Sequence, residues 1–161
     1  MGVDLVVIDT PPAITATITR VVGLADLVIV PTRPSPHDLR AAGATVDLVE
    51  TAGKPMVFVV NAAKMRARIT GEAAIALSQH GTVAPTTVHQ RTDFAAAMID
   101  GRTVMELPRA TKSAEEVTDL WRYIDERLNG GRRPTMLTGA QSGTRATSGK
   151  RGVVPDAAAT A

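Results

Sequence analysis

An aspartate at the end of an apolar run is the first residue of this chain whose type and position suggest chemistry. Residues 3–8 are almost all apolar, and they lead into Asp9, Thr10 and two prolines. Ligands of α/β proteins bind beyond the carboxyl ends of such strands, where a carboxylate holds a cation directly or through water. Two prolines also fix the backbone path after Asp9. For Asp9 alone, the alternative is a turn-forming or helix-capping role.

Basic residues gather at two further places. Lys64, Arg66 and Arg68 precede a helix-type segment, and Arg91 opens the pattern R-x-x-F-x-x-A. Lysine and arginine on one face can neutralise nucleic-acid phosphates and release counterions. The alternative is a solvated surface, which we favour for the first cluster. The histidines have no metal-ligand spacing and are interpreted as surface or cap positions: His37, His80 and His89.

Strand-type and helix-type patterns alternate along the chain and position these side chains. Short apolar runs without polar alternation predict strands at residues 3–8, 27–30, 56–60 and 82–88. Helices are predicted from the N-cap Ser35 to a stop at Gly53, over 70–80 and 93–100, and from a capping box at 113–116 to residue 128. This order predicts an α/β fold: three layers, with a doubly wound, mostly parallel sheet.

Composition limits the remaining possibilities. The 161 residues suffice for one domain, and the absence of cysteine excludes disulfides, zinc ribbons and thiol nucleophiles. No apolar stretch approaches the roughly 20 residues of a membrane span, so we expect a soluble, cytoplasmic protein. Residues 129–161 carry five Lys/Arg against one Asp and show no periodicity. We therefore predict a folded domain over 1–128 and a disordered basic tail over 129–161.

Four segments, taken in order, resemble the ParA/MinD family of deviant Walker-A ATPases, in particular small ParA-type partition ATPases. They are DLVVIDTPP, ADLVIVPTRPSPHDLRAA, VVNAAKMRARIT and RTDFAAAMIDGRTVMEL. The resemblance covers about residues 3–128 and implies a P-loop NTPase-like fold. It also implies ATP and Mg²⁺ as cofactors, a homodimer, sequence-independent binding to DNA, and a ParB-like partner protein. The implied location is cytoplasmic and nucleoid-associated.

The resemblance gives individual residues expected roles. Asp9 matches the Walker-B aspartate that reaches Mg²⁺ through water, and Thr10 and Pro11 match the switch segment that responds to the γ-phosphate. Asn61 matches a position that can hydrogen-bond adenine, for which an amide offers both donor and acceptor; the alternative is a turn residue after a strand. Arg91 matches a basic position that contributes to DNA binding.

The family's phosphate loop, K-G-G-x-G-K-[ST], does not occur in this sequence. The nearest decoy, at residues 143–151, has the wrong glycine spacing and places Arg151 where a hydroxyl is required. In the family this loop precedes the strand at 3–8, so we expect a fold truncated at its N-terminus, from a longer reading frame or a decayed gene. No catalytic residue is assigned. We also expect residues 3–8 to form an exposed sheet edge that makes the chain marginally stable and prone to self-associate.

Three functional hypotheses follow. The first is a ParA-like plasmid or chromosome partition ATPase. We expect its 161 residues to be inactive alone, so whether this chain is itself an enzyme is left open. The second is a non-catalytic DNA- or partner-binding module derived from that fold. A third, a MinD-like protein that cycles on membranes, has little support because the tail lacks an apolar stripe.

Overall fold

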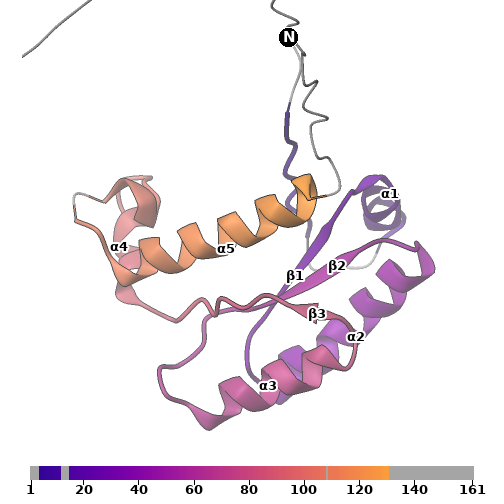
Figure 1. Ribbon diagram of the computed structural model, residues 1–161, viewed down its shortest axis with the longest axis horizontal. Coiled ribbons are helices and arrows are strands. Elements are labelled where there is room, and N and C mark those ends of the chain that lie inside the picture. The colour runs from indigo at the N-terminus through magenta and orange to yellow at the C-terminus, as the bar shows by residue number, and fades with distance from the viewer. Residues whose placement is uncertain (1–3, 12–14, 108, 131–161) are drawn as a thin grey trace, which may run out of the picture.

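The computed structural model describes residues 4–11, 15–107 and 109–130. Its elements follow one another as α1 (Ala16–Leu24), β1 (Val28–Thr32), α2 (Pro36–Thr51), β2 (Met56–Val60), α3 (Arg68–Ser78), β3 (Thr82–Val83), α4 (Thr92–Met98), the 3-10 helix η1 (Val104–Glu106) and α5 (Lys112–Asn129). Strands and helices alternate, as the sequence pattern predicts (Figure 1).

The described strands form one parallel sheet in the order β1-β2-β3. Val28 pairs with Met56 and Thr32 with Val60, so β1 and β2 run in register over their whole length. β3 adds a shorter ladder, in which Val57 pairs with Thr82. The predicted parallel α/β architecture is therefore confirmed, and the carboxyl ends of the strands meet at one edge of the sheet.

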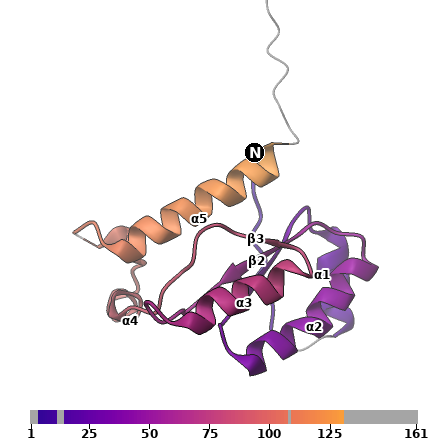
Figure 2. The ribbon, with the colours of Figure 1, turned by 60° about the horizontal axis from the view of Figure 1, so that its bottom comes forward.

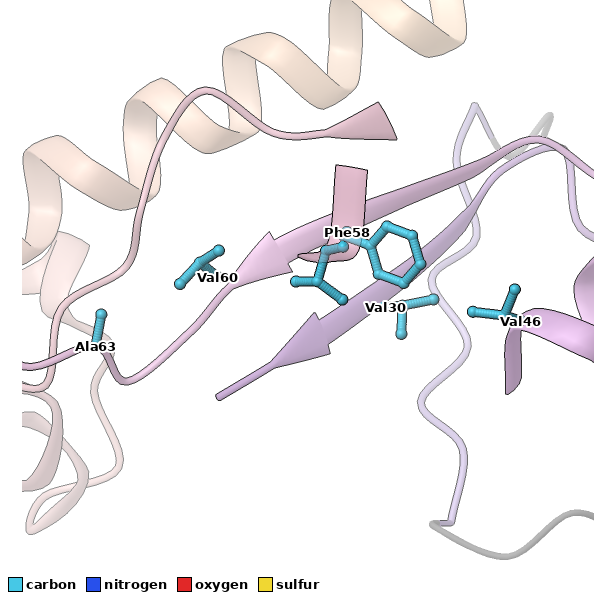
Figure 3. Close-up of a cluster of buried hydrophobic side chains, with 6 residues drawn as sticks. Val30, Val46, Phe58, Val60 and Ala63 are labelled. Carbon is cyan, nitrogen blue, oxygen red and sulfur yellow. The ribbon is translucent and has the colours of Figure 1, made fainter. Parts of the chain in front are cut away.

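The side chains of β2 alternate between the two faces of this sheet and create three layers. Phe58 and Val60 pack on the face covered by α2 and α3, in a cluster with Val30, Val46, Ala63 and Leu77 (Figure 3). Val57 and Val59 pack on the opposite face, against Phe94 of α4 and Leu120 and Tyr123 of α5. Figures 1 and 2 show α5 on one side of the strands and α2 and α3 on the other.

α1 was not anticipated by the sequence pattern. Its N-cap is Thr15, whose hydroxyl accepts a bond from the N–H of Ile18 at 3.4 Å. Ile18 and Val22, four residues apart, pack on Val49 of α2. α1 therefore extends the helical layer rather than the sheet.

The start and end of α2 are set by the capping and stop residues that the sequence predicts. Ser35 caps the helix by accepting a hydrogen bond from the N–H of Asp38 at 3.2 Å, and Pro36 occupies the first helical position. After the helix ends, Gly53 adopts a φ of +62°, which a residue without a Cβ adopts at no steric cost. The predicted helix and its stop are confirmed.

The strand predicted at residues 3–8 is wrong for the part that the structure describes. Residues 4–11 contain no strand, and in Figure 1 this indigo segment extends away from the sheet. Leu5, Val6, Val7 and Ile8 are 45%, 69%, 81% and 53% exposed. An apolar β-branched run is held as a strand by ladder bonds to a neighbour, and within the described residues this run has no neighbouring strand.

Three further predictions need correction. The strand expected at 82–88 stops at Val83, because Pro85 has no N–H to donate, although an isolated bridge joins Ala63 to His89 beyond it. The helix expected over 70–80 begins earlier, at Arg68. The capping box expected at 113–116 is absent, because Thr111 is the N-cap of α5.

A capping box occurs instead at Thr103 and Glu106 of η1. Among the described residues, no helix is long and apolar enough to cross a membrane. α5 continues to Asn129, one residue past the predicted end of the domain. From residue 131 onward, the predicted disordered tail lies outside the described residues.

Candidate functional site

A cleft of about 350 Å³ lies beyond the carboxyl ends of the strands. It is formed by residues that follow β1, β2 and β3 and by the first turn of α4. Its lining combines two arginines with amide, imidazole and apolar groups: Arg33, Asn61, Ala62, Val88, His89, Gln90, Arg91 and Phe94. In open parallel sheets this edge is where ligands bind. The cleft is therefore the candidate functional site.

Asn61 is positioned by the sheet and by its own turn. Its N–H donates to the carbonyl of Thr32 at 2.9 Å, which extends the β1–β2 ladder by one residue. Its Oδ1 accepts from the N–H of Ala62 at 2.9 Å, and Ala62 has a φ of +51°. The carbonyl of the side chain thus stabilises the turn, as the alternative interpretation predicts, and the side-chain NH₂ is the group left to donate into the cleft.

Glu116 of α5 joins two cleft residues that come from the segment between β3 and α4. Its Oε1 lies 2.6 Å from Arg91 Nη2 and 2.9 Å from His89 Nδ1. Its Oε2 accepts from the backbone N–H of His89 at 3.0 Å. The three side chains are only 16–23% exposed. One carboxylate therefore organises the basic wall of the cleft.

The electrostatics of this cluster favour ionised Glu116 and protonated Arg91. Burial opposes the charge on Glu116, but hydrogen bonds from Arg91 and His89 outweigh it and hold the pKa of the carboxyl below its ordinary value. The hydrogen bond to Glu116 raises the pKa of Arg91, against the effect of burial. The Nε atom of Arg91 is buried without a hydrogen-bond partner in the described structure.

Beneath this wall, α4 and α5 are joined by a second polar contact. Ser113 is fully buried, and its Oγ donates to Asp93 Oδ2 at 2.9 Å. Ser113 and Glu116, expected to cap α5, instead lie inside the helix and face the α4 region. His89 lines the cleft with 23% of its side chain exposed, and it is paired with Glu116 rather than capping a helix.

Sequence reasoning did not assign Glu116 to the site, and no local pattern could have done so. Its contacts with His89 and Arg91 span 27 and 25 residues. By contrast, Lys64 and Arg66 lie on an exposed loop and Arg68 is the first residue of α3; all three are exposed, in agreement with a solvated surface. Arg91 touches this loop through a contact of 3.8 Å from its Nη2 to Met65 Sδ.

The structure brings Asn61 and Arg91 into one cleft and leaves Asp9, Thr10 and Pro11 elsewhere. These three residues are exposed, lie on the segment without a strand, and are not among the residues that line the cleft. Within the described residues, no group of three or more His, Cys, Asp or Glu side chains could hold a metal ion.

Comparison with known proteins places this geometry in context. No protein-family model matches the chain. The chain is 29% identical over 125 residues to maintenance of carboxysome distribution protein A of Halothiobacillus neapolitanus, a match that covers 73% of this chain and 58% of that protein. The structure is similar to the crystal structure of the cell division ATPase MinD of Pyrococcus furiosus. That similarity has a TM-score of 0.55 at 16% identity and covers 64% of this chain and 44% of the other.

The chain is similar in sequence to one ParA/MinD-type ATPase and in fold to another, which supports a deviant P-loop ATPase-like protein of that type. The sequence relative and the fold agree on this, and the resemblance of the four segments is confirmed. The match spans a little over half of the length of the curated relative. The described structure thus contains a cleft at the carboxyl edge of a parallel sheet, and the segment that carries Asp9 does not line that cleft.

Proposed function

We propose that this chain is part of a ParA-like positioning ATPase and that its cleft receives the adenine side of ATP. The observation that carries the proposal is the position of Asn61, whose side chain lines a cleft beyond the carboxyl ends of parallel strands. The relationship to a carboxysome-distribution protein and the fold shared with a cell division ATPase support it. Asn61 would donate from its NH₂ to an acceptor on the purine edge.

The remaining roles require residues that the cleft does not contain. Asp9 would hold Mg²⁺ through water, and Thr10 and Pro11 would respond to the γ-phosphate, once residues 4–11 are placed beside a phosphate-binding loop. A phosphate site needs backbone N–H groups from a glycine-rich loop and a lysine on the terminal phosphates. The 161-residue sequence contains no such loop. We therefore expect ATP hydrolysis only where another segment supplies it.

The proposed cycle follows the family. ATP would favour a homodimer that binds DNA without sequence preference, and a ParB-like partner protein would stimulate hydrolysis and release the dimer. The protein would act in the cytoplasm on the nucleoid, and a replicon or another cargo would be positioned by the cycle. Electrostatic attachment to DNA phosphates would make the attachment sensitive to salt.

Calorimetric titration with a non-hydrolysable ATP analogue tests the nucleotide proposal. For the 161-residue chain alone we expect no saturable heat, with or without Mg²⁺, because the phosphate and metal sides of the site are not assembled. For a version preceded by an in-frame K-G-G-x-G-K-[ST] loop we expect Mg²⁺-dependent binding, and Asn61→Ala in that version should weaken it. Unchanged affinity in this variant would contradict the role of Asn61.

A second candidate is a DNA-binding module that works without ATP. The observation in its favour is the basic edge around the cleft, where Arg33 and Arg91 line the opening. Arg91 contacts Met65 of the exposed loop that carries Lys64 and Arg66 and leads into Arg68 of α3. Acidic partners in this region are Glu116 for Arg91 and Glu72 for Arg68. The edge would contact phosphates and sugar rather than bases.

Fluorescence anisotropy with a labelled duplex of arbitrary sequence distinguishes the two candidates. The module predicts binding that is present without ATP and that weakens steeply between low and physiological salt. Absence of binding by the 161-residue chain at low salt would remove the module and leave the nucleotide-dependent proposal.

A further inference from the structure

Arg91 lines the cleft, but its guanidinium is already paired with a carboxylate. The Nη2 atom of Arg91 lies 2.6 Å from Oε1 of Glu116, and 22% of the Arg91 side chain is exposed. The same Glu116 oxygen is shared with His89 Nδ1, while its second oxygen accepts from the His89 backbone. A carboxylate thus occupies the position on Arg91 that an incoming phosphate oxygen would take.

The other charged groups around Arg91 have partners of their own. Asp93 accepts from Ser113 at 2.9 Å, and Glu115 is paired with Lys112 at 2.6 Å. These acids act on Arg91 only at longer range. Glu116 is therefore the acid in direct competition with a ligand for Arg91, among the residues that the structure describes.

We propose that Glu116 acts as a latch: by pairing with Arg91, it keeps the guanidinium from contacting phosphate until a ligand displaces the carboxylate. The inference rests on the proposed binding of DNA phosphates at this edge of the protein. In the latched state Arg91 stays against α5. When a phosphate-bearing ligand displaces the carboxylate, Arg91 gains a contact with phosphate, and Glu116 keeps its bond to the backbone of His89. The latch lowers affinity for polyanions and makes binding depend on the charge at residue 116.

Glu116→Gln tests the latch, because it removes the charge and keeps an oxygen for the His89 N–H. Glu115→Gln is the matched control: it removes the same charge one residue away, where Lys112 is the partner and the side chain is 55% exposed. Arginine labelling with phenylglyoxal, read by mass spectrometry, measures the release of Arg91 directly. Arg68, 92% exposed, serves as internal reference. We expect several-fold faster labelling of Arg91 in Glu116→Gln and no change in Glu115→Gln.

Duplex anisotropy then measures the consequence for binding. We expect Glu116→Gln to bind about three- to tenfold more tightly at low salt, with the salt slope steeper by about one, as for one added phosphate contact. Glu115→Gln should leave the slope unchanged. The gain should disappear in Glu116→Gln combined with Arg91→Ala. Titration with ATP instead of duplex separates a free nucleotide phosphate from the DNA backbone as the source of the anion.

The outcomes separate the latch from the proposed function. Wild-type labelling of Arg91 in a folded Glu116→Gln overturns the latch, and so does faster labelling with unchanged affinity while the wild type binds DNA. If neither protein binds DNA, the DNA-binding proposal fails, and the labelling rate alone decides whether Glu116 restrains Arg91. Should Glu116→Gln not fold, Glu116→Asp keeps the charge with a shorter reach, and it should label at an intermediate rate; labelling at the wild-type rate would overturn the latch.

Discussion

β2 and residues 5–8 have similar sequences but opposite environments: β2 is buried in the sheet, and residues 5–8 are exposed. Both are short, apolar and rich in valine. In β2 the last four residues are at most 3% exposed, between β1 and β3 and under helices on both faces. Residues 5–8 are 45–81% exposed and make no ladder within the described structure. The difference lies in their neighbours rather than in their own composition.

The contrast extends to the side chains that follow each segment. Asn61, at the end of β2, is fixed by the ladder bond to Thr32 and opens onto the cleft. Asp9, at the end of the unpaired segment, is exposed and does not line it. A sheet edge positions functional groups only when the strands that carry them are paired. The side chain that follows the paired strand therefore lines the cleft, and the one that follows the unpaired segment does not.

The largest expected effect comes from truncating the buried region. Phe58→Ala should lower the free energy of unfolding by about 4 kcal/mol, because Phe58 is fully buried at the centre of the sheet. Val7→Ala, in the 81% exposed position, should change it by no more than about 0.5 kcal/mol. Urea unfolding of both variants measures this; similar losses would break the distinction between the two regions.

A smaller effect is expected at the buried contact between α4 and α5. Ser113→Ala should cost about 2 kcal/mol, because a hydrogen bond to the Asp93 carboxylate is lost in a fully buried position. Ser78→Ala, which removes an exposed hydroxyl bonded to the Ile75 carbonyl, is the control. Equal denaturation midpoints for the two variants would show that the contact does not support the assembled edge.

Acid should weaken the assembled edge through Glu116. The folded-state pKa of this carboxyl is depressed, so its contribution to stability is present above the ordinary value of 4.5 and is lost as pH falls through the lower folded value. Below pH 4.5, the unfolding free energy of the wild type should therefore fall more steeply than that of Glu116→Gln. Parallel curves in that window, measured by urea titration at several pH values, would contradict the assignment.

The smallest expected effect on stability comes from charging the unpaired segment. Val6→Lys combined with Val7→Lys should leave the unfolding free energy within about 0.5 kcal/mol of the wild type, since both side chains are exposed. It should nevertheless reduce self-association, because an exposed apolar run invites pairing with another chain. Sedimentation velocity over a concentration series measures this, and a monomeric wild type at high concentration would show that the run is harmless.

Much of the fold could be predicted because its signals are local. Ser35, Pro36 and Gly53 bound α2, and the apolar run at 56–60 is β2. The parallel sheet followed from alternation of the elements. The failure at residues 4–8 concerns information that is not local, because they have strand composition and no described partner strand. The failure at β3 is different, because Pro85 is a local signal against a longer strand.

The candidate site likewise contains residues that the sequence predicted and one that it did not. Asn61 and Arg91 were anticipated from the resemblance to the family, and the cleft brings them together. Glu116 was missed because its partners are 25 and 27 residues away and its spacing from Ser113 mimics a capping box. The roles of Asp9, Thr10, Pro11, Asn61 and Arg91 remain predictions.

Hydrogen exchange of the 161-residue chain tests the central contrast most directly. If the segment that carries Asp9 is unpaired while the cleft is assembled on a paired sheet, amides of residues 5–10 will exchange at the earliest time point. Amides of β2 and Asn61 will remain protected, because they are bonded in the ladder and buried. Equal protection of residues 5–10 and β2 would show that the segment carrying Asp9 is part of the sheet and would contradict the account.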